Sequence, residues 1–325
     1  MKHLKYFIAL VVGVTMTACS SKDDLANEQK TPKEIKITTS IEGMSTRAVE
    51  NDVNLQNTAF YNGANINVYF TNSTTGNPIA PLTAESPYAT YSYDGTDWST
   101  ATTGLYYPIN GNGITAFGIY PSTDKDGNPI TKNTTTFTVV DSYGLQNTDA
   151  LYRQSDLMYA YTFGSNSWVE SNSIPLKFHH CMTKIVVKIV LDNEVITEEQ
   201  FQNMFYEIYV HCNRTASLSF DDNKIKASAD WNNGDIIFVN DRSELNLQNG
   251  NTCIIPPQAV PGNEDFIYIN CGAQEFYWKT PAEGYTFEGG KKYVFTLRIT
   301  KKAAGIAAPT VKGWEDGANI SEDAE

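Results

Sequence analysis

The chain lacks the sequence patterns of the common enzyme classes. Its 325 residues contain no G-x-S-x-G elbow, no phosphate-binding loop, no H-E-x-x-H pair and no glycine-rich dinucleotide fingerprint. Carboxylates are so numerous that no pair stands out as a general acid and base. We therefore assign no catalytic residue and no cofactor, and we predict that the protein is not an enzyme.

Basic side chains are also in short supply. Lys and Arg number 24 against 37 Asp and Glu, which gives a formal net charge of −13. An acidic surface repels the phosphate backbone of nucleic acids. We accordingly expect no nucleic-acid partner.

Long hydrophobic runs are missing as well. The apolar run at 7–14 follows two lysines and is too short to span a hydrocarbon core of about 30 Å. Small residues then lead to Cys19, and the arrangement resembles the lipidation box of bacterial lipoproteins. The resemblance implies a signal peptide over 1–18, a lipid on Cys19 and a polar tether over 19–33. This lipid would attach the chain to the outer membrane.

Few residues are available as metal ligands, because the chain has only four histidines. His179 and His180 precede Cys181, and zinc is commonly bound by His and Cys. Neighbouring side chains in a strand point to opposite faces, so this pair cannot reach one ion without a bulge. We predict structural histidines and no metal site.

Cysteines are equally few beyond Cys19. The four that remain lie in strand-like segments, where a free buried cysteine behaves as a small hydrophobe. Four cysteines also allow three disulfide pairings, and the sequence does not choose among them. Free thiols and disulfides therefore both stay open for Cys181, Cys212, Cys253 and Cys271.

Aromatic residues, by contrast, are abundant. The 19 Tyr and 15 Phe, against 19% charged residues, are typical of β-structure with amphipathic faces. Short apolar runs separated by turn-forming clusters favour β-sandwiches. They predict strands over 66–70, 88–93, 114–120, 135–140, 157–161, 176–191, 216–220, 236–239, 253–255, 266–270 and 292–300.

Two further segments have a clear periodicity. Ile35, Ile37 and Ile41 share one face of a first strand, because side chains alternate along a strand. The segment 197–208 begins with a capping box at Thr197 and continues with apolar residues at helical spacing, so it predicts one helix. We expect a first sandwich domain over 34–172, a second over 173–315 and a tail over 316–325.

Exposed aromatic side chains suggest an alternative function. Trp98 and Trp168 could belong to an aromatic patch that stacks against a glycan or another ligand of a host or bacterial surface. In a sandwich such residues are more often part of the core and its rim. We keep ligand binding by a surface lipoprotein as the second hypothesis.

Several phrases are similar, in the same order, to those of the Bacteroidales fimbrillins, and the closest likeness is to the Mfa-like branch. The similarity extends over almost the whole mature chain, and its first phrase is Trp98 followed by 105–108. The phrases are LYYP at 105–108, ITAFGIYP at 114–121, DLMYA at 156–160, LKFHH at 176–180, KIVV at 184–187, IPPQ at 255–258, YVFTL at 293–297 and VKGW at 311–314.

The resemblance implies two transthyretin-like β-sandwich domains and a role as a pilus subunit at the cell surface. In this family the lipoprotein precursor reaches the outer membrane, and a trypsin-like protease then cuts after an arginine. Arg47, before Ala48, fits that site here. The cut would free the first strand, 34–47, and open a groove for a strand of a neighbouring pilin, with 303–314 as the expected donor segment.

The isoleucines of the first strand support this hypothesis independently. Removing Ile35, Ile37 and Ile41 would uncover large apolar side chains, each worth about 1.5–3 kcal/mol of burial. It would also leave unpaired backbone groups, which a strand from another chain could pair. Ligand binding by a pilus tip belongs to the second hypothesis. The sequence leaves open whether cleavage occurs, which ligand is bound, and whether the subunit belongs to the stalk, the tip or the anchor.

Overall fold

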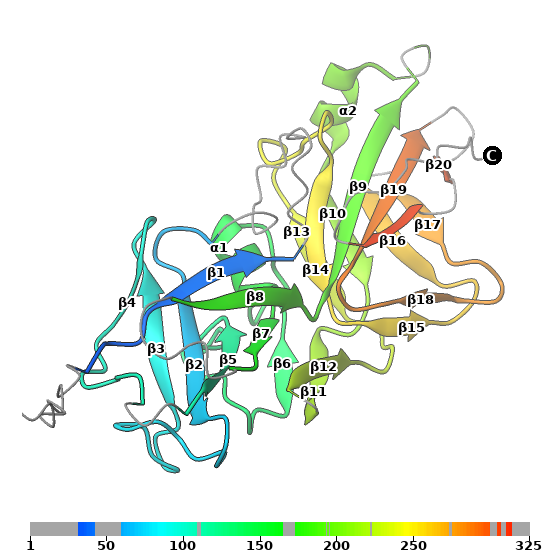
Figure 1. Cartoon of the computed structure of the whole chain (residues 1–325). Coiled ribbons are helices and arrows are strands. Elements are labelled where there is room, and N and C mark those ends of the chain that lie inside the picture. Colours follow the sequence, from blue (N-terminus) through cyan, green and yellow to red (C-terminus); the bar gives the residue numbers. More distant parts are fainter. Residues whose placement is uncertain are drawn as a thin grey trace, which may run out of the picture. The chain divides into compact units, whose positions relative to one another are not determined.

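A computed structural model describes residues 32–42, 60–108, 112–164, 173–192, 194, 196–221, 223–272 and 275–299, with the backbone of 304–306 and 310–313. These residues are mainly in strands, and all of them belong to one compact unit, Pro32–Glu325. The predicted fold class, a mainly β protein of sandwich type, is confirmed. The described residues also form two short helices, and Figure 1 shows how these helices and the strands are arranged.

The N-terminal half of the chain builds a seven-stranded sheet. Most neighbouring strands are antiparallel, but the first strand pairs in parallel with a strand far along the sequence. In order across the sheet the strands are β1 (Ile37–Ile41), β8 (Ile174–His180), β7 (Met158–Thr162), β5 (Ile114–Tyr120), β2 (Asn65–Asn72), β3 (Tyr88–Tyr93) and β4 (Trp98–Thr100).

Both faces of this sheet are buried in its middle. Along β2, Ile66 and Val68 enter one hydrophobic cluster, whereas Tyr69 enters another. The first cluster, which we call the N-terminal core, also receives the isoleucines of β1 and the apolar face of β8. The second cluster lies against the three-stranded sheet of β12 (Lys224–Ser228), β11 (Thr215–Asp221) and β6 (Thr136–Thr138).

The C-terminal half contributes three more sheets. A four-stranded sheet and a five-stranded sheet share the larger hydrophobic cluster with a two-stranded ribbon. The four-stranded sheet has β13 (Asp235–Val239), β10 (Glu207–His211), β16 (Asp265–Asn270) and β17 (Glu275–Lys279). The five-stranded sheet has β14 (Asn251–Ile255), β9 (Thr183–Leu191), β19 (Lys291–Ile299), β20 (Ala304–Ile306) and β21 (Thr310–Gly313), and the ribbon has β15 (Gln258–Val260) and β18 (Tyr285–Phe287).

The long strand expected over 176–191 is in fact two strands. β8 ends at His180, β9 begins at Thr183, and the two strands belong to different sheets. The prediction was wrong here because apolar residues continue through Cys181 and Met182, which are both buried at the junction. A continuous apolar run does not show where a chain passes from one sheet to the next.

The helix predicted at Thr197 is present but shorter than expected. Helix α2 (Glu198–Met204) has the capping box between Thr197 and Gln200. It ends before β10, whose pairing with β16 overrides the helical spacing of the apolar residues. Helix α1 (Asp149–Ser155), which Thr148 caps through its side-chain oxygen, was not predicted.

The division into domains at 172/173 stays a prediction. β8 begins just after this point and pairs with β1 and β7 of the seven-stranded sheet. The three-stranded sheet likewise combines β6 with β11 and β12 from the C-terminal half. The described sheets therefore join residues from both sides of the proposed boundary.

Candidate functional site: the N-terminal edge strand

Strand β1 lies at one edge of the seven-stranded sheet. It runs parallel to β8, with Ile37 opposite Ile174 and Ile41 opposite Phe178 (Figure 1). The Ile174 amide donates to the Lys36 carbonyl at 2.7 Å, and the Glu42 amide donates to the Phe178 carbonyl at 2.8 Å. β1 is therefore held along its full length by one neighbouring strand.

A short second contact fixes the N-terminal end of β1. The Ile35 amide donates to the Leu105 carbonyl at 2.9 Å, and the Tyr107 amide donates to the Lys33 carbonyl at the same distance. Since Ile35 bonds away from β8 and Lys36 bonds toward it, the odd-numbered residues of β1 direct their backbone groups to the outer edge. Beyond Ile35 no described strand pairs with this edge.

The inner face of β1 closes the N-terminal core. Ile35, Ile37 and Ile41 are 5%, 6% and 1% exposed, whereas Lys36 and Thr38 between them are exposed. Each isoleucine contributes about 1.5–3 kcal/mol through burial. The alternation predicted for this strand is the one that the structure has.

Thr39, the fourth residue on the inner face, is bound through its hydroxyl. The Trp98 indole Nε1 donates to Thr39 Oγ1 at 2.9 Å, which connects β4 to β1 across the outer edge. The indole ring is held by an edge contact with Phe60, at 5.2 Å between centroids and 84° between planes, and by Tyr93 at 5.0 Å. Trp98 therefore presents a fixed N–H donor to β1.

An ionic contact holds the C-terminal end of β1. The Glu42 carboxylate accepts from His179 Nδ1 and lies 3.5 Å from Lys177 Nζ, both on the outer face of β8. Partial burial acts to raise the pKa of Glu42, but hydrogen bonding and charge from His179 and Lys177 together outweigh it. The net result is a pKa below the ordinary value of glutamate.

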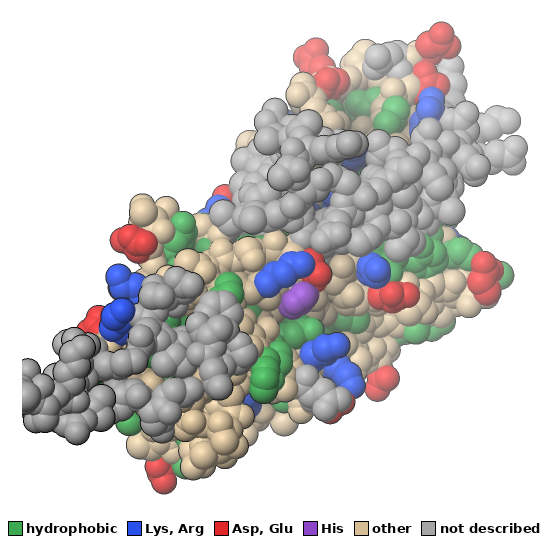
Figure 2. Space-filling model, viewed as in Figure 1, with side chains coloured by type: hydrophobic (Ala, Val, Ile, Leu, Met, Phe, Trp, Pro, Cys, Tyr) green, Lys and Arg blue, Asp and Glu red, His purple; other side chains and the backbone are tan. Residues whose placement is uncertain are grey.

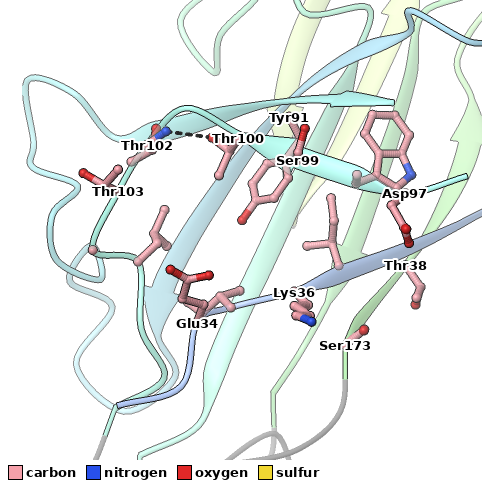
Figure 3. Close-up of a pocket in the computed structure, with 15 residues that line it drawn as sticks. Glu34, Lys36, Thr38, Tyr91, Asp97, Ser99, Thr100, Thr102, Thr103 and Ser173 are labelled. Atoms are coloured by element: carbon pink, nitrogen blue, oxygen red, sulfur yellow. Dashed lines mark hydrogen bonds between the residues drawn. The ribbon is translucent and has the colours of Figure 1, made fainter. Parts of the chain in front are cut away.

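A groove of about 440 Å³ runs beside the outer edge of β1, between this strand and β4. Figure 3 shows the Tyr91 side chain reaching from β3 into it, toward the side on which Glu34 and Lys36 lie. The Tyr91 hydroxyl is buried and has no hydrogen-bond partner among the described residues. Burial raises the pKa of this hydroxyl, and Tyr107 and Glu34 raise it further. The rest of the groove wall is rich in Ser and Thr.

The outer surface near these strands is mixed in charge. On the face that Figure 2 shows, acidic and basic side chains of the described residues occur next to one another, among polar and apolar surface. Among the described residues, no helix is both long and apolar enough to cross a lipid bilayer.

The predicted site residues fall into two groups. Ile35, Ile37 and Ile41 come together on the inner face of β1. Trp98 lies beside them, but its N–H is engaged with Thr39, so its proposed role in a ligand-binding aromatic patch stays a prediction. Four predicted site residues lie outside the described residues. They are the lipidation residue Cys19, the cleavage pair Arg47 and Ala48, and the second tryptophan, Trp168.

The histidines and cysteines have structural environments. His179 contacts Glu42 at the surface, whereas His180 points into the protein and pairs with Asp156 at 2.8 Å. Within the described residues, no three His, Cys, Asp or Glu side chains cluster as metal ligands would. All four cysteines of the described residues are buried free thiols, and burial raises the pKa of each: Cys181, Cys212, Cys253 and Cys271.

Sequence reasoning missed the polar residues that hold β1. Thr39 is bound by Trp98, 59 residues away in the sequence. Glu42 is bound by Lys177 and by His179, which is 137 residues away. The sequence does show that Glu42 follows the strand directly, which is a weak indication of a terminal ion pair.

The segment expected to donate a strand is itself paired in this structure. The backbones of β20 and β21 hydrogen-bond to β19, with Ile299 opposite Ala304 and Lys291 opposite Gly313. The C-terminal stretch thus forms the edge of the five-stranded sheet of its own chain.

The sheets and the edge strand define a β-sandwich protein. The fimbrillin-like family model matches residues 46–314, and the chain belongs to this family of pilus and cell adhesion proteins. The resemblance seen in the sequence is therefore confirmed. No curated protein sequence matches the chain.

Solved structures show the same fold. A candidate cell adhesion protein from Bacteroides ovatus superposes with a TM-score of 0.64 at 16% identity, covering 89% of this chain and 100% of that one. A candidate cell adhesion protein from Bacteroides uniformis gives a TM-score of 0.55 at 15% identity, covering 86% of this chain and 99% of that one. At these identities the likeness concerns the fold alone.

Proposed function

We propose that the chain is a subunit of a cell-surface pilus that is exported as a lipoprotein and assembled by exchange of β1 after cleavage at Arg47. One observation supports this most strongly. β1 closes a hydrophobic core with three isoleucines, yet among the described strands it is an edge strand that pairs along its full length with β8 alone. Arg47 follows Glu42 by five residues, so a cut there would separate β1 from the chain that follows.

Cleavage would change how β1 is held without changing its contacts. Before the cut, β1 is covalently linked to the part of the protein that it binds. A short link keeps the strand at an effective concentration on the order of 10⁻³ M around its binding site. After the cut, β1 dissociates as a separate peptide. A strand of a neighbouring pilin could then bind to β8 and cover the N-terminal core, which is donor-strand complementation.

The same cut would control attachment to the membrane. In our proposal the lipid on Cys19 holds the precursor at the outer membrane until a trypsin-like protease cuts after Arg47. Cys19 and β1 both precede Arg47 in the sequence, so one cleavage separates both from the body of the protein. Anchorage and groove opening are thereby coupled.

Peptide exchange tests this function directly. The purified chain is cut with trypsin, the product beginning at Ala48 is verified by mass spectrometry, and a fluorescent peptide of residues 33–42 is added in urea below the unfolding midpoint. We expect the label to bind the cut chain and not the uncut chain. The variant Arg47→Gln, treated in the same way, is the matched control and should take up no label.

Two outcomes would contradict the proposal. One is uptake of the label by the uncut chain at the same rate as by the cut chain. The other is a cut chain that takes up no label at any peptide concentration up to the millimolar range. In either case β1 would be an ordinary edge strand.

A further inference from the structure

We infer that the place which β1 occupies, beside β8 and over the N-terminal core, accepts only an incoming strand that carries two polar side chains in addition to an apolar face. We also infer that this strand comes from a second kind of subunit. The two side chains are a hydroxyl at the position of Thr39 and a carboxylate at the position of Glu42. The inference rests on the proposed strand exchange, and it specifies which partner the exchange accepts.

The apolar requirement follows from the spacing of the isoleucines. A strand that runs parallel to β8 must place large apolar side chains where Ile35, Ile37 and Ile41 lie, each at most 6% exposed. Ile41 is the most deeply buried of the three, opposite Phe178. A polar or charged side chain at this position would be buried without a partner.

The hydroxyl requirement follows from Trp98. Its Nε1 points at the inner face of β1 and donates to Thr39 Oγ1. Phe60 and Tyr93 pack against the indole, so the ring cannot turn away without losing these contacts. An incoming strand with an aliphatic residue at this position would leave a part-buried N–H without an acceptor.

The carboxylate requirement follows from two basic side chains on β8. Lys177 and His179 converge on Glu42, and the His179 ring is also stacked on Tyr159 at 5.4 Å between centroids. Without a carboxylate at the end of the strand, Lys177 and His179 would face each other with no acid between them. The groove is therefore complementary in charge to a strand that ends in Asp or Glu.

The chain's own C-terminal segment does not meet these requirements. Within 303–314 the only hydroxyl side chain is that of Thr310. Aligning Thr310 with Thr39 puts Lys312 in the buried position of Ile41 and Gly313 in the position of Glu42. It also puts Pro309 at Thr38, whose N–H the parallel pairing directs toward β8, and proline has no N–H to donate. A second copy of this chain is thus a poor donor for its own groove.

A competition experiment with the cut chain tests these requirements. Unlabelled peptides displace the fluorescent 33–42 peptide, and each substitution has a control of the same chemistry on the exposed side of the strand. Thr39→Val should weaken binding by about 3–10-fold, as expected for loss of one hydrogen bond, whereas Thr38→Val should change it by less than about 2-fold. Glu42→Gln should weaken binding by about 2–5-fold at low salt and less at high salt, whereas Glu34→Gln should have little effect.

The C-terminal peptide tests the identity of the partner. A peptide of residues 303–314 should fail to displace the label even in large excess, and the cut chain alone should remain monomeric in sedimentation. Displacement by this peptide, or self-association of the cut chain, would overturn the assignment to a second kind of subunit.

Equal binding of all the 33–42 variants would overturn selection by polar side chains while leaving strand exchange intact. Failure of the unmodified peptide to bind would overturn the exchange itself and this inference with it.

Discussion

The two edges of the seven-stranded sheet are built in opposite ways. β4 is joined to β3 by a tight turn in which Asp94 Oδ1 accepts from the amides of Thr96 and Asp97, at 2.8 and 2.7 Å. Among the described residues β1 has no partner close to it in the sequence, and its contact between Glu42 and His179 spans 137 residues. The contacts that hold β4 thus join residues close together in the sequence, whereas those that hold β1 form only when distant parts of the chain have folded together.

This difference shows why one edge strand is suited to exchange and the other is not. A strand in a tight hairpin re-forms its contacts as soon as they break, because its turn keeps it close to its partner. β1 keeps its position through its backbone pairing with β8 and through its side chains: three buried isoleucines, the Thr39 hydroxyl and the Glu42 carboxylate. One cut in the chain after it would make all of these contacts intermolecular.

The largest expected difference between the edges is in core burial. Ile41→Ala should lower the free energy of unfolding by about 2–4 kcal/mol, because it removes buried apolar volume and leaves a cavity. Ser99→Ala on exposed β4 should change it by less than about 0.5 kcal/mol. Urea denaturation of the uncut chain measures both, and similar losses for the two variants would contradict the comparison.

A second prediction concerns Phe178 of β8, which lies opposite Ile41 of β1, and its contact with Gly118 of β5. A Cβ placed on Gly118 would lie 2.9 Å from Phe178 Cζ, so Gly118→Ala should cost about 1–3 kcal/mol through overpacking. Hydrogen exchange should show a larger loss of protection in β1 than in β4, because Phe178 lies opposite Ile41.

Combining Gly118→Ala with Phe178→Leu checks the cause. The smaller side chain makes room for the new methyl group, so the double variant should lose less stability than the sum of the single variants. Simple additivity would show that the clash is not between these two residues.

A third and smaller effect comes from the contact that joins the two edges. Trp98→Phe removes the N–H that reaches Thr39 and should cost about 0.5–1.5 kcal/mol, together with some lost packing. The coupling energy in a double-mutant cycle with Thr39→Val should be of the order of 1 kcal/mol. A coupling near zero would mean that the two edges are energetically independent.

The sequence predicted the local features of β1 and of the fold class. The alternation of Ile35, Ile37 and Ile41 marked the buried face because strand side chains alternate whatever the fold. The capping box at Thr197 likewise marked the start of α2, since it depends on residues three apart. The resemblance to fimbrillins agreed with both.

Features that depend on pairing between distant strands could not be predicted from local sequence patterns. The break between β8 and β9 carries no glycine or proline and arises because the two strands belong to different sheets. The contacts of Trp98 with Thr39 and of Glu42 with His179 join positions whose proximity only the assembled sheet creates. Most of what makes β1 a candidate site therefore cannot be predicted from residues 33–42 alone.

The smallest expected effect is a dependence of the β1 edge on pH. The folded-state pKa of Glu42 lies below its ordinary value of 4.5, so its ionised form stabilises the fold. That contribution is complete above the ordinary pKa and is lost as the pH falls through the lowered value. Because the side chain is 39% exposed, we expect no more than about 1 kcal/mol, and less at high salt.

Glu42→Gln should remove this dependence, which hydrogen exchange of the Glu42 amide can follow between about pH 3 and pH 6.

Asp94 provides the contrast between the two edges. The backbone amides of Asp97 and Thr96 lower the pKa of its carboxyl, so acid should loosen the β3–β4 turn as well. Because that turn is local, Asp94→Asn should change exchange at Thr96 and Asp97 and leave β1 protected. If acid instead loosened both edges equally in both variants, Glu42 would not act as the contact that holds the end of β1.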